Sequence, residues 1–253
     1  MKPLLTLKSG PLGLDFYLFD NIPVPVFHLS DAIGFPPPHL ASKEGLLAVG
    51  GDLSIKRLIL AYQMGIFPWF SEGDPILWWS PDPRLVLYPS EIKISKTLKK
   101  VLKKNVFGTT MDTAFDDVVT QCAKVRLENN QGTWIVKDMI DAYCRLHRAG
   151  FAHSVEVWRD GKLTGGLYGV SLGKSFFAES MFHRISNASN VALVTLAKYL
   201  NELSFDLIDC QVRTEHLVRF GAREIPRKLF LKKLERSLSA PTLRGKWEYM
   251  GNV

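Results

Sequence analysis

The clearest pattern along the chain is an apolar segment, residues 207–212, that lies between two segments of helical character. In residues 190–203, before it, apolar positions recur every three or four residues, and residues 213–216, after it, begin a polar-faced helix. A short apolar segment between two helices is typical of a buried strand. We therefore predict a strand over residues 207–212.

Two polar residues interrupt this apolar strand. Because side chains alternate between the faces of a strand, Asp209 and Gln211 are expected to project together, and Cys210 to project from the opposite face. A carboxylate only accepts hydrogen bonds, whereas an amide both donates and accepts, so this pair is the first candidate for chemistry. The alternatives are a half-exposed edge strand, or an Asp209 that is neutralised by Arg213 or Arg184.

The remaining periodicity predicts an α+β protein. Residues up to about Leu40 are rich in proline and are predicted to be an irregular wrapping segment, and residues 129–132 a turn. Helical patterns occupy residues 55–64, with Ser54 as the capping residue, 91–104, 113–122, 137–148, 191–203 and 223–236. Strand patterns occupy residues 85–88 and 107–110, and a meander is expected over residues 153–158, 163–170 and 175–182.

This order of elements divides the chain into two domains. We predict a small N-terminal α/β domain over residues 1–90 and a larger sheet domain over residues 91–253. Residues 91–104 would form a basic helix that connects the two.

Composition narrows the classes of protein to consider. The chain has 253 residues and 46% hydrophobic content, which is enough for a real core, and no apolar run approaches a membrane span, so a cytoplasmic protein is expected. The three cysteines are scattered, without a CxxC pair or histidine spacing suited to zinc, so neither a disulfide framework nor a metal site is predicted.

The charge favours a polyanionic partner. The formal net charge is +7. Four lysines fall on one face of the helix predicted over residues 91–104 and form a candidate stripe for the phosphates of a nucleic acid: Lys96, Lys99, Lys100 and Lys103. The second basic segment is the helix predicted over residues 223–236, and the alternative for both segments is an ordinary solvated face.

Two further features are candidates for binding. Trp69, Trp78 and Trp79 lie within eleven residues, and most of these rings should be core, but a ring left exposed beside basic residues would stack on an unpaired base. By alternation, Glu179 should share a strand face with two large apolar residues, Phe177 and Met181. Burying a carboxylate between them costs free energy unless it is paired or takes part in function.

Six short motifs in one order give the chain a family resemblance that covers roughly residues 45–230. Each motif is weak alone, but together they resemble leucyl/phenylalanyl-tRNA–protein transferase. The motifs are GGDLS (50–54), GIFPWF (65–70), WWSPDPR (78–84), GTWI (132–135), ESMF (179–182) and IDCQV (208–212).

The resemblance implies a fold, a reaction and a set of site residues. Such enzymes transfer leucine or phenylalanine, with methionine as a further candidate, from aminoacyl-tRNA to an N-terminal Arg or Lys of a protein. The transfer marks that protein for degradation. Their fold is an acetyltransferase-like (GNAT-type) sheet domain behind a small N-terminal domain. By the same resemblance, Asp209 and Gln211 match the catalytic pair. The implied substrate-binding residues are Glu179, Trp69, Trp134, Met181, Leu167 and Leu196, of which the two leucines stand where some relatives have larger side chains.

The chemistry that this implies is simple. An aminoacyl ester is already activated, so the enzyme aligns the acceptor amine with the ester carbonyl and manages one proton, and no cofactor is expected. We expect Asp209 to collect the proton and Gln211 to position the amine or polarise the carbonyl. Glu179 would be a counter-charge for the acceptor's cationic side chain, although an ion pair with Arg184 would explain it almost as well. A monomer is expected, without DNA or membrane partners.

Three other classes of protein are weighed against this one. A coenzyme A-dependent acyltransferase needs a glycine-rich turn for the pyrophosphate, but residues 213–216 follow the strand instead. A cysteine acyltransferase would use Cys210, which is expected to project away from Asp209 and Gln211. A non-catalytic RNA-binding protein would explain the lysines and tryptophans but not the polar pair.

Overall fold

The computed structural model describes residues 7–9, 15–19, 22–128 and 133–251. Their strands form three sheets. A small sheet has the order β1 (Leu7–Ser9), β2 (Asp15–Phe19), β3 (Ile22–Pro25), and a second has the order β4 (Phe27–Leu29), β5 (Leu46–Gly50), β7 (Leu77–Trp79), β6 (Phe67–Pro68). The large sheet has the order β14 (Arg223–Ile225), β8 (Arg84–Leu87), β13 (Leu207–Gln211), β12 (Ser175–His183), β11 (Lys162–Leu172), β10 (Ala152–Arg159), β9 (Gly108–Met111), β15 (Met250–Gly251).

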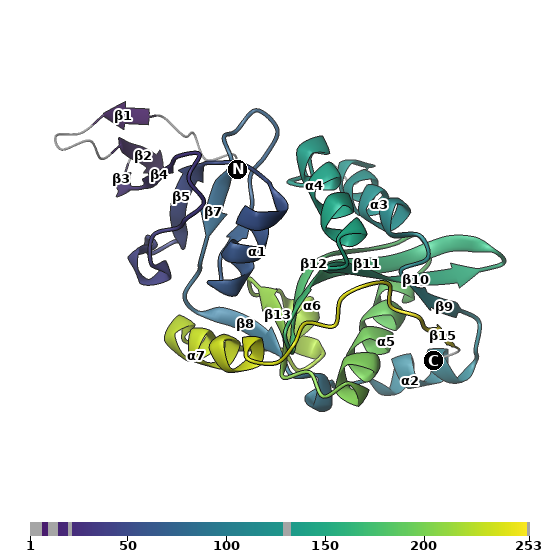
Figure 1. Ribbon diagram of the computed structural model, residues 1–253. Helices are drawn as coiled ribbons and strands as arrows, with labels where there is room; N and C mark the ends of the chain where they lie inside the picture. Colours follow the sequence, from purple (N-terminus) through teal and green to yellow (C-terminus); the bar gives the residue numbers. More distant parts are fainter. Residues whose placement is uncertain (1–6, 10–14, 20–21, 129–132, 252–253) are drawn as a thin grey trace.

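Helices cover both faces of the large sheet (Figure 1). α3 (Phe115–Glu128) and α4 (Lys137–Arg148) pack on one face, together with α1 (Ile55–Gln63) and α7 (Arg227–Leu238). α2 (Lys96–Lys103) and α5 (Ala188–Glu202) pack on the other face, near the short α6 (Glu215–Arg219). Strand alternation explains the two cores, because Val86 of β8 faces the first while its neighbours Leu85 and Leu87 face the second.

The periodicity predicted most of these elements. The α+β fold, the helix over residues 137–148 and the meander are confirmed. Ser54 caps α1 as expected, because its hydroxyl accepts a hydrogen bond from the backbone N–H of Arg57 at 3.3 Å. The predicted turn over residues 129–132 lies outside the described residues.

Four predictions are wrong in their limits or their kind. The N-terminal forty residues are not irregular, since they contain β1 to β4, and β4 pairs in parallel with β5. The lysine helix is shorter than predicted because it begins after its capping residue, Ser95, whereas α3 is longer and runs to Glu128. The segment 223–236 begins as the strand β14, and its helix starts only after Pro226.

The large sheet includes a strand from the first ninety residues. β8 pairs with β13 and with β14, so the polypeptide enters this sheet before residue 90. β13 therefore lies between β8 and β12 in the interior of the sheet, and the prediction of a possible edge strand is wrong. Its pairing with β12 is parallel, with α5 as the crossover between them.

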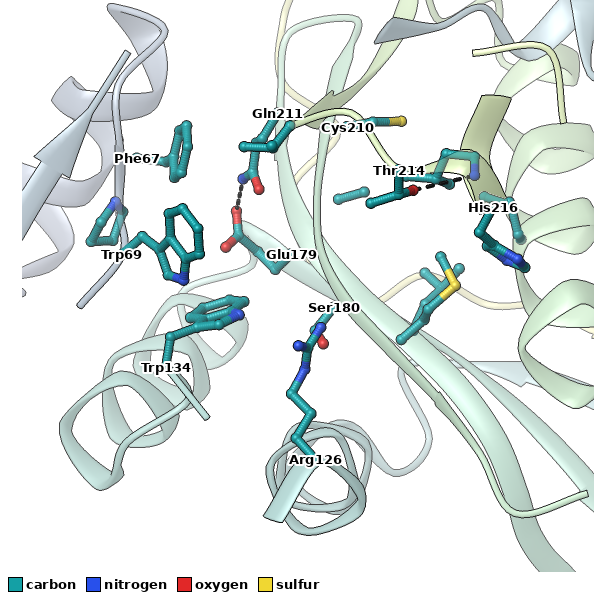
Figure 2. Close-up of a pocket in the computed structure, with 17 residues that line it drawn as sticks. Phe67, Trp69, Arg126, Trp134, Glu179, Ser180, Cys210, Gln211, Thr214 and His216 are labelled. Atoms are coloured by element: carbon teal, nitrogen blue, oxygen red, sulfur yellow. Dashed lines mark hydrogen bonds between the residues drawn. The ribbon is translucent and has the colours of Figure 1, made fainter. Parts of the chain in front are cut away.

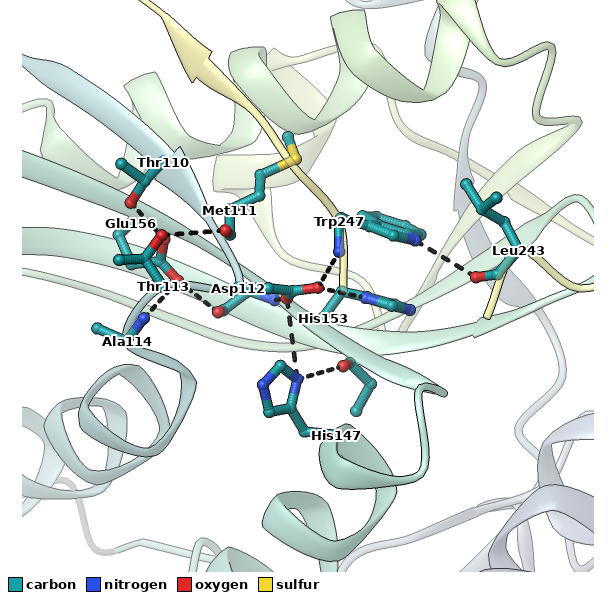
Figure 3. Close-up of polar contacts among 12 residues, drawn as sticks. Thr110, Met111, Asp112, Thr113, Ala114, His147, His153, Glu156, Leu243 and Trp247 are labelled. Carbon is teal, nitrogen blue, oxygen red and sulfur yellow. Dashed lines mark hydrogen bonds and ion pairs between the residues drawn. The ribbon is translucent and has the colours of Figure 1, made fainter. Parts of the chain in front are cut away.

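The C-terminal segment is tied to the far edge of the same sheet (Figure 3). The carboxylate of Asp112 accepts hydrogen bonds from the backbone N–H of Trp247 at 2.7 Å and of Ser154 at 2.8 Å, and contacts Nδ1 of His153 at 2.7 Å. The ring of Trp247 stacks on His153 with 3.8 Å between centroids. In the described ranges no helix has the length and apolar character needed to cross a bilayer.

Candidate active site

A pocket of about 410 Å³ opens between the small N-terminal unit and the ends of β12 and β13. Figure 2 shows Phe67, Trp69 and Trp134 on one side of it and Thr214 and His216 on the other, with a carboxylate and an amide between them. Six of the predicted site residues line this pocket: Gln211, Glu179, Trp69, Trp134, Met181 and Leu167. Trp69 follows β6, Trp134 precedes α4, and the other four residues belong to β11, β12 and β13, so the fold brings together positions far apart in the sequence.

Glu179 is the carboxylate of this pocket, and its partners are neutral. Oε1 accepts hydrogen bonds from the Tyr62 hydroxyl at 2.8 Å and from Nε2 of Gln211 at 2.9 Å, and Oε2 accepts one from the Tyr143 hydroxyl at 2.7 Å. Burial raises the pKa of Glu179 to about 7, because the charged form is poorly solvated there. The predicted ion pair with Arg184 is wrong, since Arg184 pairs with Glu128.

Asp209 lies behind the pocket and does not line it. Its side chain is fully buried, and Oδ1 and Oδ2 accept hydrogen bonds from Nε and Nη2 of Arg84 at 2.8 and 2.7 Å. This bidentate geometry is the strong form of a carboxylate–guanidinium pair. Arg213 and Arg184, the partners suggested by the sequence, are therefore wrong, and Arg84 neutralises Asp209 instead.

A local irregularity of β13 separates Asp209 from Gln211. The register with β8 shifts between the two residues, and Gln211 has φ 61°, in the left-handed region. The backbone N–H of Gln211 donates to Oδ1 of Asp209 at 2.9 Å, which stabilises this conformation. Cys210 packs with Ile208 in the second core, opposite Asp209, so the predicted alternation of Cys210 is confirmed, although Cys210 also lines the pocket.

The tryptophans divide as the sequence suggested. Trp78 is 0% exposed and Trp79 9%, so both belong to the core, whereas Trp69 is 43% exposed at the rim of the pocket. The backbone of Trp69 is fixed by Trp79, whose indole N–H donates to the carbonyl oxygen of Trp69 at 2.7 Å. Trp134 is half-buried just before α4. The two rings at the pocket thus present flat apolar surface to whatever enters.

The floor of the pocket is apolar. It includes Leu167, Met181 and Leu193, which belong to β11, β12 and α5. Leu196, a predicted pocket residue, is fully buried and does not line the pocket, because it lies nearly one turn further along α5. Leu193 takes its place.

The lysine stripe lies apart from the pocket. Lys96, Lys99, Lys100 and Lys103 are exposed on α2, while Leu98 of the same helix is buried against the core beside α5. No residue of α2 lines the pocket. In the described part of the chain, no group of three His, Cys, Asp or Glu side chains is arranged to hold a metal ion.

Several residues of the site escaped sequence reasoning. Tyr62 and Tyr143 are ordinary apolar-face positions of their helices by pattern, and only the packing of α1 beside α4 brings their hydroxyls to Glu179. Arg126 of α3 also lines the pocket, and its Nε atom is buried without a hydrogen-bond partner in the described structure. Arg84 did have a signal, since it ends the motif WWSPDPR.

Two models of one protein family match this chain. Residues 86–235 match the model of the leucyl/phenylalanyl-tRNA protein transferase family, and residues 51–82 match that family's N-terminal domain. A leucyl/phenylalanyl-tRNA–protein transferase of Desulfatibacillum aliphaticivorans is 59% identical over 88% of this chain and 96% of its own length. One from Desulforapulum autotrophicum is 54% identical over 90% of this chain and 100% of its own length.

Solved structures give more distant likenesses. An aminoglycoside acetyltransferase from a soil metagenome aligns with a TM-score of 0.37 and 10% identity, over 47% of this chain and 86% of its own. The C-terminal domain of a putative lysylphosphatidylglycerol synthetase from Agrobacterium fabrum aligns with a TM-score of 0.40 and 12% identity, over 78% of this chain and 64% of its own. The two family models and the high identity of near full-length relatives show that the chain belongs to the leucyl/phenylalanyl-tRNA–protein transferase family.

Proposed function

We propose that this protein transfers leucine, phenylalanine or methionine from aminoacyl-tRNA to the N-terminal Arg or Lys of an acceptor protein, in the cytoplasm, and so marks that protein for degradation. One observation carries the proposal. A single pocket joins an apolar floor, an exposed aromatic wall and a carboxylate–amide pair. These are the three environments that an aminoacyl-adenosine and an attacking amine require.

Each part of the substrate has a complementary part of the pocket. Leu167, Met181 and Leu193 offer the apolar surface for a leucyl or phenylalanyl side chain. Trp69 and Trp134 offer rings on which the terminal adenine stacks. The guanidinium of Arg126 supplies the positive charge that a phosphate of the terminal nucleotide needs.

Gln211 and Asp209 have different parts in this proposal. Gln211 lines the pocket and orients the acceptor amine or the ester carbonyl. Asp209 has both oxygens engaged by Arg84 and holds the backbone of Gln211. We therefore assign Asp209 as a positioning residue that acts through Gln211.

The body of the tRNA needs further contacts outside the pocket. The exposed lysines of α2 support such contacts, because each lysine on a phosphate releases counterions. Neutralising Lys99 and Lys103 should weaken tRNA binding and flatten the dependence of log affinity on log salt. Lys162, exposed at the tip of the β10–β11 hairpin, is the matched control. If the salt dependence is unchanged when Lys99 and Lys103 are neutralised, the α2 lysines form an ordinary solvated face.

Transfer itself is tested with leucyl-tRNA and a peptide that begins with Arg, before and after ribonuclease treatment. We expect a peptide extended by one leucine only while the tRNA is intact.

Trp69→Ala and Trp134→Ala should each cost about 1–3 kcal/mol in binding of an aminoacyl-adenosine fragment. Trp158→Ala removes the same indole outside the pocket and should cost nothing there. Binding of tRNA without transfer would instead indicate a non-catalytic RNA-binding protein.

A further inference from the structure

Four oxygen atoms of three side chains at the pocket form a ring that three short contacts close. The hydroxyls of Tyr62 and Tyr143 lie 2.7 Å apart. The Tyr62 hydroxyl lies 2.8 Å from Oε1 of Glu179, and the Tyr143 hydroxyl lies 2.7 Å from Oε2 of the same carboxyl group. All three residues are buried, so water does not supply these contacts.

The ring contains more hydrogen bonds than the two tyrosines can supply. Three O···O contacts of this length need three hydrogen atoms, and each hydroxyl carries one. Both tyrosines keep their protons, because burial raises the pKa values of Tyr62 and Tyr143 well above their usual range. The third hydrogen must therefore belong to Glu179.

Gln211 locates that hydrogen. Its Nε2 donates to Oε1 of Glu179 at 2.9 Å, and Oε1 also accepts from Tyr62, so the acid hydrogen lies on Oε2. Oε2–H then donates to the Tyr143 oxygen, Tyr143 donates to Tyr62, and Tyr62 donates to Oε1. A shift of all three hydrogens around the ring moves the acid hydrogen to Oε1, so either carboxyl oxygen can present it.

The charges around Glu179 favour the same protonation state. Tyr62 of α1, Tyr143 of α4 and Tyr168 of β11 face it as neutral groups, and Asp209 on the β13 side opposes a second negative charge. The buried cation Arg84 is already paired with Asp209. Arg126 lines the same pocket but makes no hydrogen bond to Glu179 among the described residues.

We propose that Glu179 enters the reaction as a neutral acid and carries the proton of the transfer, a role that rests on the proposed function. The amine nitrogen forms the C–N bond to the ester carbonyl carbon, and the C–O bond to the ribose oxygen of the tRNA breaks. Glu179 gives its hydrogen to the leaving oxygen and takes one from the acceptor nitrogen. The products are an amide and a free ribose hydroxyl, and Glu179 ends as it began. It is thus a proton carrier and not a fixed counter-charge.

The first experiment looks for the proton itself. Infrared difference spectra of the full-length protein should contain the carbonyl band of a protonated carboxylic acid at pH 6, and this band should fade as the pH is raised through about 7. Glu179→Gln should lack the band. Its absence from the wild-type protein at pH 6 would overturn the proposal, and this readout requires neither tRNA nor transfer activity.

The second experiment measures single turnovers with leucyl-tRNA and the Arg peptide. Glutamine has the shape of a neutral carboxyl group, so Glu179→Gln should keep both substrate affinities within a few-fold and lose about 10²–10⁴-fold in the rate of transfer. Transfer at the wild-type rate would overturn the catalytic role. If the wild-type protein shows the band but transfers nothing, the proposed function fails and the protonated ring stands.

A third variant keeps the test independent of the folding of Glu179→Gln. Tyr143→Phe opens the ring and leaves the carboxyl group in place. The infrared band and the pH profile of the transfer rate should then shift together to a higher pH, because the Tyr143 hydroxyl holds the pKa of Glu179 down. If neither midpoint moves, the proton is not held by the ring and the proposal is wrong.

Discussion

Asp209 and Glu179 are two buried carboxylates that touch the same residue, and they differ in their other partners. The backbone N–H of Gln211 donates to Asp209, and its side-chain amide donates to Glu179. Asp209 has a guanidinium partner, whereas Glu179 has only neutral donors. Burial is common to both, so the partner decides whether a carboxylate is a fixed structural charge or a group that exchanges a proton near neutral pH.

The Asp209 ion pair also joins separate elements of the fold. The guanidinium of Arg84 lies between two rings, 4.8 Å from the centroid of Phe67 and 4.7 Å from that of Phe230. Phe67 belongs to β6 and lines the pocket, and Phe230 belongs to α7. One cation thus contacts the N-terminal unit, the large sheet and the C-terminal helix, and it keeps the pocket wall in position.

The largest effect expected is the loss of this cation. Arg84→Met should leave Asp209 buried without a counter-ion and lower the free energy of unfolding by about 3–5 kcal/mol. Urea unfolding measures the loss. The double variant Arg84→Met/Asp209→Leu removes both charges and should recover most of it. If Arg84→Met alone unfolds at the same urea concentration as the wild type, Asp209 does not depend on its counter-ion.

A pH-dependent difference of similar size is expected at the other carboxylate. In the unfolded chain Glu179 loses its proton near pH 4.5, whereas burial raises its pKa in the folded protein to about 7. The stabilisation from the bound proton is therefore complete below about pH 4.5 and is lost as the pH rises to about 7. Glu179→Gln has no proton to lose.

This difference is measured as unfolding free energy against pH. Relative to the wild type, Glu179→Gln should gain up to about 3 kcal/mol between pH 4.5 and pH 8. Glu44→Gln, at an exposed position, is the matched control and should show little change. Parallel curves for the Glu179 variant and the wild type would contradict a raised pKa at this site.

The two carboxylates also show which parts of the site can be predicted from the sequence. The apolar pattern located β13, and the cluster of tryptophans indicated that most of its rings are core, because both depend on residues close together in the chain, whereas Trp69 was singled out only by the family resemblance. The partners of the two carboxylates are 36 to 125 residues away, on separate helices and strands. Periodicity specifies which face of a helix is buried but not which side chain that face meets. The bulge between Asp209 and Gln211, with Gln211 at φ 61°, left no signal in the apolar pattern of the strand.

A smaller effect separates a neutral ring from a charged one. Tyr143→Phe removes the hydroxyl that contacts both Glu179 and Tyr62 and should lower the unfolding free energy by about 1–3 kcal/mol. The loss should be larger at pH 8.5, where the carboxyl group is charged, than at pH 5, where it is neutral, because the Tyr143 hydroxyl holds the pKa of Glu179 down. Tyr62→Phe is the matched variant on the other side of the ring. Equal losses at the two pH values would mean that Glu179 does not change its charge in this range.

The smallest effect is expected at Cys210, which lies between Asp209 and Gln211 in sequence. Its thiol lines the pocket, and burial raises its pKa, so at neutral pH it is not the thiolate that a nucleophile must be. Cys210→Ala should therefore transfer leucine at close to the wild-type rate and lose about 1 kcal/mol of stability through the small cavity. Cys122→Ala, fully buried outside the pocket, is the matched control for that cavity. An inactive Cys210→Ala, with leucine trapped on the wild-type protein, would instead assign the chemistry to the thiol and leave both carboxylates structural.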